Sequence, residues 1–380
     1  MKKKTATPAA ASFRVHVPTL LLVSALIFIM VAAAVTGCKK DNKIVLTAGF
    51  IFPDAINDGG WSQTHNDGRL ELETLTGVET KYLEKISESV PAEAEQAIDT
   101  FAGLGCGFIV AASPLYYETV VRKAAEYPQI RFFVCTSLSR PEINNISTYY
   151  ARIEEPFYLA GIAAGRKSVS GKIGYVASVP SADAIRTINS FTLGVRSVAG
   201  EAIVLVEWAG SKIDNIKIKA ASESLLEKEC DVIAQDNGSP VPMLAAAGKG
   251  ASSIGYALRP EGDFPESHLA SPVYNWGMYY RSIAESIMNG TWSAADYRGG
   301  MKEGFTELAW SPENNNEEAA VRINEILEGV RDGYFDIYSI FTGPVRNQDG
   351  RMVLKDGEVI KEAVLLGMNW FVEGVEGAIP

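Results

Sequence analysis

The stretch GCGFIVAASP at residues 105–114 has a counterpart in ECDVIAQDNGSP at residues 229–240. In each stretch a cysteine precedes a short apolar run, which ends in a polar tip followed by Ser-Pro and a helical pattern. The two cysteines, Cys106 and Cys230, lie 124 residues apart. Strand–helix units resemble one another in many proteins, but this shared order predicts two lobes of like topology.

Short apolar runs, typical of buried strands, alternate with longer helical patterns along the whole chain. The strand candidates are residues 44–52, 108–113, 131–136, 172–178, 202–208, 231–236 and 252–257. The clearest helical patterns cover residues 92–104, 154–169, 181–198, 216–229 and 278–290. Continuous apolar strands joined by helices are typical of parallel sheets covered on both faces, so we expect an α/β fold.

The N-terminus has the pattern of an export signal. Residues 1–16 are basic and contain no acid, and the apolar run VPTLLLVSALIFIMVAAAV follows at residues 17–35. That run is long enough to be a membrane-spanning signal anchor. The sequence VTGC at residues 35–38, however, resembles a bacterial lipobox, which implies cleavage before Cys38 and lipidation of its thiol. We therefore expect a signal peptide over residues 1–37 and a lipidated leash over residues 38–43. The lipid would hold the protein at a membrane, facing the periplasm or the cell exterior.

Charge and cysteine content exclude several classes of partner. The chain carries −11, and because the leader is basic, the mature part is more acidic still. Nucleic acid requires a basic surface, so we expect no nucleic-acid partner. The three other cysteines, Cys106, Cys135 and Cys230, form no CxxC pair and are expected in the core. With two histidines beyond the leader and no paired Cys/His spacing, we expect neither a metal site nor a cofactor.

Catalytic signatures are absent from the sequence. It contains no GxSxG, no GxxxxGK[ST] and no GxGxxG after a strand. The acid pair Glu154-Glu155 could serve acid–base chemistry, although acids at a helix start commonly complement the helix dipole. We expect a binding protein rather than an enzyme.

The glycine-rich turn NDGGWSQTHNDG at residues 57–68 connects a strand candidate to a helix. Ligands of open α/β sheets bind beyond the carboxyl ends of the strands, and unpaired first amides of such a helix would point into the cleft. Trp61 and His65 would share one helix face, with Gln63 on the adjacent face. Asp58 could accept a hydrogen bond from a ring N–H group. The alternative is a buried Trp with a capping Asp.

Other strand tips carry similar side chains. SPVYNWG at residues 271–277 again leads from a strand into a helix and supplies Asn275 and Trp276. Tips in the second half of the chain add Arg186 and Asp236. Aromatic faces beside amides and acids are typical of a site for a flat, polar heteroaromatic ligand, held by stacking and by hydrogen bonds at its edge.

An ordered set of motifs from residue 44 to the C-terminus resembles the basic membrane lipoprotein (BMP) family of ABC-transporter substrate-binding proteins. The motifs are NDGGW, EEPFYLAGIAAG (154–165), GKIGYVAS (171–178), NSFTLGVRSV (189–198), DVIAQDNGSP (231–240), SPVYNWG, GGMKEGF (299–305) and LLGMNWFVEGVEGAIP (365–380). The resemblance implies a type I periplasmic-binding fold, with two Rossmann-like lobes that close about a hinge. Its best-understood members look like purine nucleoside receptors, and it implies ligand-binding roles for Asp58, Trp61, Glu155, Asp236, Asn275 and Trp276.

The resemblance also implies a place in transport. We expect a monomeric, lipid-anchored protein that binds a purine nucleoside or nucleobase and delivers it to the permease and ATPase of an ABC importer. Residues 44–150 would form mainly the N-terminal lobe, residues 151–275 mainly the C-terminal lobe, and residues 276–380 crossover segments in both.

The chain departs from the family pattern at three places, one of which is CTSLSRP at residues 135–141, where an acid often found at this strand tip is absent. SKIDN at residues 211–215 has Lys212 and Ile213 where related sequences commonly have an aromatic residue. GYALRP at residues 255–260 puts Arg259 near the place of a family acid. These departures leave open another heteroaromatic ligand such as riboflavin. A nucleoside-acting α/β enzyme is the alternative from a different class.

Overall fold

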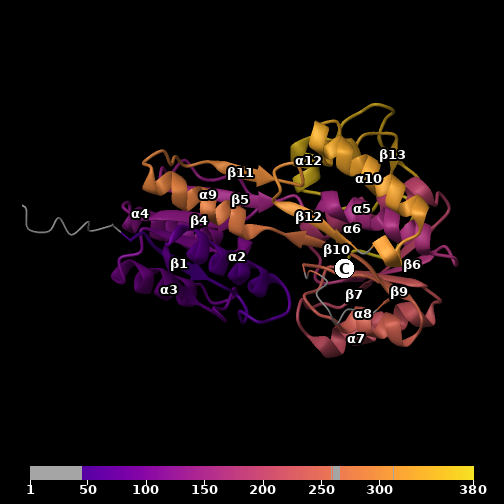
Figure 1. Cartoon of the computed structure of the whole chain (residues 1–380), viewed down its shortest axis with the longest axis horizontal. Coiled ribbons are helices and arrows are strands. Elements are labelled where there is room, and N and C mark those ends of the chain that lie inside the picture. The colour runs from indigo at the N-terminus through magenta and orange to yellow at the C-terminus, as the bar shows by residue number, and fades with distance from the viewer. Residues whose placement is uncertain (1–44, 258, 260–265, 311) are drawn as a thin grey trace, which may run out of the picture. The chain divides into compact units, whose positions relative to one another are not determined.

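The computed structural model describes residues 45–257, 259, 266–310 and 312–380 (Figure 1). The expected signal peptide, residues 1–37, and the expected lipidation site and leash, residues 38–43, lie outside them. Parallel strands alternate with helices through most of the described chain, which confirms the α/β fold.

The first sheet has six parallel strands in the order β11-β5-β4-β3-β1-β2. Its strands are β1 (Thr47–Ile51), β2 (Glu79–Leu83), β3 (Phe108–Ala111), β4 (Arg131–Cys135), β5 (Ile146–Ala151) and β11 (Asp296–Gly299). The helices that belong with this sheet are α2 (Trp61–Thr76), α3 (Pro91–Gly103), α4 (Tyr117–Glu126) and α9 (Trp276–Met288). Strand β11 and helix α9 come from late in the chain, so the polypeptide returns to this sheet after building most of the second (Figure 1).

The second sheet has seven strands in the order β12-β10-β9-β8-β6-β7-β15, and β12 runs antiparallel to β10. Its strands are β6 (Lys172–Ala177), β7 (Ile203–Trp208), β8 (Val232–Gln235), β9 (Ser252–Ile254), β10 (His268–Tyr274), β12 (Thr306–Trp310) and β15 (Val375–Glu376). Its helices are α5 (Glu154–Lys167), α6 (Ala182–Val198), α7 (Asn215–Glu227), α8 (Val241–Gly248) and α10 (Glu317–Asp332). Smaller elements are η1 (Pro114–Tyr116), η2 (Pro312–Asn314), α11 (Ile337–Ile340), α12 (Glu362–Leu366), β13 (Val345–Arg346) and β14 (Met352–Leu354).

The two sheets repeat one topology. The order β5-β4-β3-β1-β2 in the first sheet corresponds strand for strand to β10-β9-β8-β6-β7 in the second. The two cysteines of the sequence repeat occupy equivalent places, because the Cys106 N–H donates to the Phe101 carbonyl and the Cys230 N–H donates to the Leu225 carbonyl. Both thiols are buried and free, as is that of Cys135. The repeat in the sequence therefore marked a real structural duplication.

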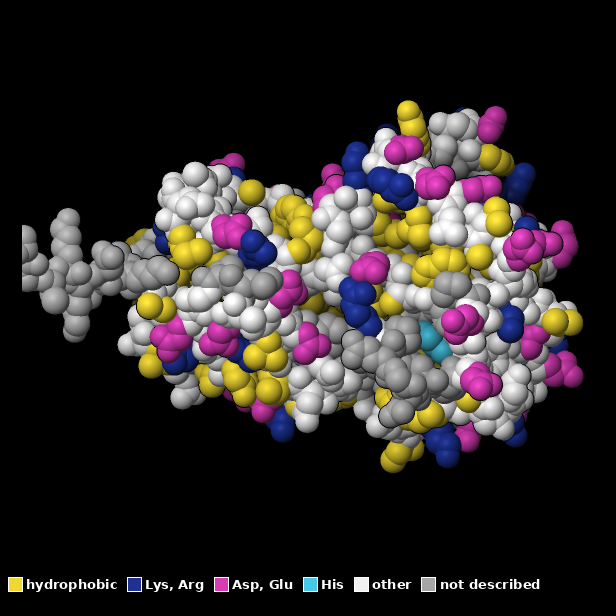
Figure 2. All heavy atoms as spheres, viewed as in Figure 1, with side chains coloured by type: hydrophobic (Ala, Val, Ile, Leu, Met, Phe, Trp, Pro, Cys, Tyr) yellow, Lys and Arg dark blue, Asp and Glu magenta, His cyan; other side chains and the backbone are white. Residues whose placement is uncertain are grey.

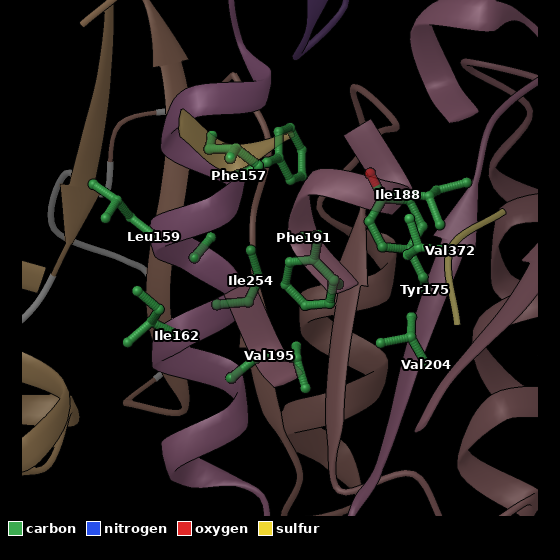
Figure 3. Close-up of a cluster of buried hydrophobic side chains, with 14 of the residues drawn as sticks. Phe157, Leu159, Ile162, Tyr175, Ile188, Phe191, Val195, Val204, Ile254 and Val372 are labelled. Carbon is green, nitrogen blue, oxygen red and sulfur yellow. The ribbon is translucent and has the colours of Figure 1, made fainter. Parts of the chain in front are cut away.

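Helices α5 and α6 lie side by side and bury their apolar faces in the core of the second sheet (Figure 3). Phe157 and Phe191 project from these helices toward Tyr175 of β6, and all three side chains are buried. Gly194 allows the close approach of the helices, since a Cβ atom there would lie 2.0 Å from the Tyr158 carbonyl oxygen. Each fully buried large apolar side chain stabilises the fold by about 1.5–3 kcal/mol.

The described residues contain no helix that is long and apolar enough to cross a membrane. On the face seen in Figure 2, acidic and basic side chains are interspersed. The sheets, by contrast, are lined by the buried hydrophobic clusters that hold each one against its helices.

Candidate functional site

Strands of both sheets end around one cavity of about 140 Å³. Residues that line it from the first sheet and its loops include Asp54, Asp58, Trp61, Glu88, Cys135 and Tyr150. Residues that line it from the second sheet and its loops include Ser178, Asp183, Lys212, Asp236, Tyr256 and Tyr274. The volume is close to that of the engineered cavities of ~150 Å³ that bind benzene. The cavity therefore has room for a ring, at the place where open α/β sheets bind ligands.

An aromatic wall forms one side of this cavity. Tyr274 stacks on Trp276 at 4.6 Å between ring centroids, with 14° between the ring planes. Trp61 meets both rings edge to face at 5.6 Å. The indole N–H of Trp61 donates to the Ala112 carbonyl at 2.6 Å, which fixes the ring across the tip of β3. Trp61 and Trp276 thus lie where the sequence placed them, on one wall of the cavity.

Asp58 has both carboxylate oxygens engaged at the start of α2. They accept hydrogen bonds from the backbone amides of Gly60, Ser62 and Gln63 at 2.8–3.0 Å. The side-chain carbonyl of Gln63 in turn accepts from the Gly59 amide. The sequence predicted that the first amides of this helix would be unpaired, whereas the structure pairs them with local side chains. Asp58 lines the cavity and also caps the helix, while Gln63 does not line the cavity.

His65 lies behind the aromatic wall rather than on it. Its imidazole stacks on Trp276 at 4.1 Å between ring centroids, with 13° between the ring planes, and Nδ1 contacts the Tyr280 hydroxyl at 2.5 Å. The side chain is fully buried, and burial lowers the pKa of His65 well below its usual value. The histidine is therefore neutral and supports Trp276 from within the protein core.

Asp236 faces the cavity from the tip of β8. Its carboxylate accepts hydrogen bonds from the Ser178 backbone amide at 2.7 Å and from the Ser178 hydroxyl at 3.2 Å. Burial raises the pKa of Asp236 to about 6, although the hydrogen bonds from Ser178 and the charge of Lys212 act in the opposite direction. Asp236 is therefore a cavity acid that changes charge close to neutral pH.

Glu155 and Asn275 lie in the connections between the two sheets. Glu155 is buried and accepts hydrogen bonds from Arg152 at 2.8 Å and from the Met301 amide at 2.7 Å. Asn275 donates to the Gly304 carbonyl and accepts from Arg259. Neither residue lines the cavity, and their contacts instead tie the three connecting segments, β5 to α5, β10 to α9 and β11 to β12, to one another.

Arg186 is buried behind the cavity wall. Its guanidinium donates to the Glu154 carboxylate at 2.7 Å, to the Tyr150 hydroxyl at 2.9 Å and to the Leu366 carbonyl at 3.1 Å. It also pairs with Asp183. Arg186 does not line the cavity, but two of its partners, Tyr150 and Asp183, do. The residue therefore holds cavity-lining groups in place from behind, and Glu154 serves as its ion-pair partner besides beginning α5.

Replacing Arg186 with methionine is expected to lower the free energy of unfolding by about 3–5 kcal/mol. The Glu154–Arg186 pair is almost fully buried, so the substitution leaves a buried carboxylate without its cation. Urea unfolding measures the change. The matched control is Arg122→Met, which removes the exposed pair with Glu95 and should cost no more than about 1 kcal/mol. Equal effects of the two substitutions would contradict the assigned role of Arg186.

The sequence missed several residues of the cavity. Tyr150 lies near the end of β5 and Tyr256 follows β9, neither of which carried a strong binding motif, and Glu88 lies in the loop before α3. Lys212 was noted only as a departure from a family motif. Cys135 was expected in the core and is buried, yet its side chain also lines the cavity. The position of each residue at or after the end of a strand was the available signal.

Comparison with known proteins gives consistent similarities. Residues 45–330 match the family model described as ABC transporter substrate-binding protein, PnrA-like. A purine-binding protein of Brucella abortus is 33% identical over 92% of this chain and 98% of its own length. A putative ABC transporter glucose-binding protein of Haloferax volcanii is 32% identical over 88% of this chain and 81% of its own. The solved structure of an ABC-transporter solute-binding protein from Conexibacter woesei shares the fold, with a TM-score of 0.66, 19% identity and coverage of 78% and 99%.

Proposed function

The chain belongs to the family of PnrA-like ABC transporter substrate-binding proteins, and on that premise we propose that it binds a purine base or nucleoside in the cavity between its two sheets. Membership of the family makes it an extracytoplasmic solute-binding protein that works with a permease and an ATPase, and not an enzyme. The resemblance stated from the sequence motifs is thereby confirmed.

The aromatic wall opposite hydrogen-bonding carboxylates is the observation that carries the choice of ligand. Trp61 and Tyr274 offer ring surface to a flat ligand, and Asp236 offers an acceptor for a ring N–H or an amino group. Stacking of a base on an aromatic side chain contributes about 1–3 kcal/mol. A purine uses both features at once, because its faces are aromatic and its edge carries donors. The likeness to a purine-binding protein over most of both chains supports this choice.

Glucose is the second candidate, because another similar relative is named as a putative glucose-binding protein. A sugar can also lie on a Trp face and donate hydroxyl groups to carboxylates. It makes less use of the ring faces of Trp61 and Tyr274, because a sugar ring is not planar. The two candidates differ in ultraviolet absorbance and in mass, so they are readily distinguished.

Mass spectrometry of the small molecules released when the purified protein is denatured tests the proposal. A purine base or nucleoside, close to one molecule per chain, supports it. A hexose or a flavin released in that proportion contradicts it. The same instrument, applied to the mature N-terminal peptide, checks the further proposal that Cys38 is diacylated and anchors a monomeric protein to the membrane.

Ligand affinity is expected to fall about tenfold as the pH is lowered from 7 to 5. The pKa of Asp236 is raised to about 6 in the ligand-free protein, and a ligand that donates a hydrogen bond to it requires the ionised form. The complex therefore binds fewer protons than the free protein below about pH 6, and by linkage its affinity decreases with falling pH. Calorimetric titrations at several pH values measure this. The Asp236→Asn variant, titrated in the same way, should bind the ligand more weakly at pH 7, and its affinity should not depend on pH. If the wild-type affinity does not depend on pH, Asp236 does not contact the ligand.

A further inference from the structure

Five acids line the cavity, and four of them already have hydrogen-bond donors within the described chain. Asp58 accepts from three backbone amides, and Asp236 accepts from Ser178. Glu88 accepts from the Ser113 hydroxyl, and Asp183 accepts from Arg186. Each of these four carboxylates is therefore stabilised by a donor from the protein itself, without a ligand. The remaining acid, Asp54, requires a different explanation.

Asp54 follows β1, in the first lobe, and its half-buried side chain lines the cavity. Its backbone amide donates to the Ser62 hydroxyl, but among the described residues its carboxylate accepts no hydrogen bond and forms no ion pair. Burial raises the pKa of Asp54, and the charges of Asp58 and Glu88 raise it further. A half-buried carboxylate beside two other acids is unfavourable unless a donor reaches it. The geometry leaves that donor to come from the cavity.

Lys212 is the counterpart of Asp54 on the second lobe. It lies on the loop between β7 and α7, is exposed, and is the only cation that lines the cavity within the described chain. Its ammonium group forms no ion pair there, but its charge lowers the pKa of Asp54, of Asp236 and of Cys135. Lys212 and these three groups all line the cavity, so its charge acts on groups from both lobes. Lys212 and Asp54 face the same space and are too far apart to pair directly.

We propose that Asp54 and Lys212 form a subsite across the cleft that binds one edge of the ligand, an edge on which a hydrogen-bond donor adjoins an acceptor. Asp54 accepts from the donor and Lys212 donates to the acceptor. The subsite rests on the proposed function, since purine bases carry such edges. In adenine two donors form such edges, the amino group beside N1 or N7 and the N9–H group beside N3. A ligand in this position joins the two lobes through two charge-assisted hydrogen bonds, which are stronger than neutral ones.

The loop SKIDN at residues 211–215 contributes Lys212 to this subsite. Lys212 adds a hydrogen-bond donor to a cavity in which Trp61 and Tyr274 already provide ring surface. It thereby makes the binding of this chain depend on the pattern of donors and acceptors at the ligand edge.

Calorimetric titration with three ligands tests the subsite. Adenine keeps both donor–acceptor edges, unsubstituted purine lacks the amino group, and 9-methyladenine lacks the N9–H group. For wild-type protein, the ligand without the bound edge should be weaker than adenine by roughly tenfold or more, as expected for hydrogen bonds to charged groups. Asp54→Leu should lower the affinity for adenine by about the same factor. It should not change the affinity for the one ligand that lacks the bound edge. Lys212→Met should also weaken adenine about tenfold, whereas Lys219→Met, which removes an exposed charge from α7, should have no effect.

Three results would overturn the subsite. The first is an Asp54→Leu effect of equal size on all three ligands, and the second is no effect on any of them. The third is a Lys212→Met effect no larger than that of Lys219→Met. Thermal unfolding of each ligand-free variant shows that it is folded. If wild-type protein binds none of the three ligands, the proposed function itself fails, and the subsite fails with it, a result distinct from the other three.

Discussion

Replacing Gly238 with alanine is expected to weaken ligand binding by about tenfold to a hundredfold without unfolding the protein. Gly238 lies on the loop after β8, and Gly60 lies directly before α2 in the other lobe. A Cβ atom built on Gly238 would lie 2.6 Å from the Gly60 Cα, and one built on Gly60 would lie 2.4 Å from the Gly238 Cα. The two backbones therefore touch where the lobes meet at the cavity.

The expected magnitude follows from the cost of forcing extra atoms into a closely packed contact, about 1–3 kcal/mol. That cost falls on the closed arrangement alone, since the methyl group has no clash once the lobes move apart. Apparent affinity decreases in proportion to the fraction of binding-competent protein, which gives the factor above. The same contact explains why both positions are glycine.

Titration and small-angle scattering together measure the effect. At a ligand concentration that saturates only the wild type, scattering from Gly238→Ala should still resemble that of the ligand-free protein, whereas the wild type should become more compact. Gly248→Ala is the matched control, because a Cβ atom there meets nothing within 4 Å. Unchanged affinity of Gly238→Ala would show that the contact does not form in the ligand-bound state.

Replacing Trp61 with alanine is the second substitution with a large expected effect, again a tenfold to hundredfold loss of affinity. Trp61 lines the cavity, and removal of an aromatic face from a stacked base costs about 1–3 kcal/mol. Trp61→Phe keeps a ring but loses the hydrogen bond to the Ala112 carbonyl, so its ligand affinity should lie between that of the wild type and that of Trp61→Ala.

The control for Trp61 is a tryptophan far from the cavity. Trp292 packs edge to face on Phe133 and does not line the cavity, so Trp292→Ala should leave affinity unchanged even if it lowers stability. Calorimetry with the best purine ligand measures all three variants. Equal affinity of Trp61→Ala and wild type would remove Trp61 from the ligand site.

The fold was readable from the sequence because its central strands are continuous apolar runs. Residues 172–178 and 231–236, for example, were expected as strands and appear as β6 and β8. Strands such as β2 and β11 were missed, since they lie at sheet edges with few buried side chains and lack an apolar pattern. Their pairing depends on neighbours far away in the chain, which a local pattern cannot reveal.

The site was readable only where a residue's position after a strand fixed its surroundings. Trp61 and Asp236 follow β1 and β8 and line the cavity. Arg186 is placed by Glu154, a partner 32 residues earlier, and His65 by Tyr280, a partner 215 residues later. Asp54 and Lys212 line one cavity from two different lobes. Such partners are decided by tertiary packing, so a motif could indicate the region of the site but not the direction of each side chain.

Calorimetric titration of ligand-stripped protein with adenine, adenosine and glucose tests the central claim most directly. Stripping by unfolding and refolding removes any bound molecule, and far-ultraviolet circular dichroism shows that the fold has returned. Binding of one purine base or nucleoside per chain, much tighter than any binding of glucose and weakened by Trp61→Ala, is the predicted result. Binding of glucose at one molecule per chain with no heat from either purine would contradict it.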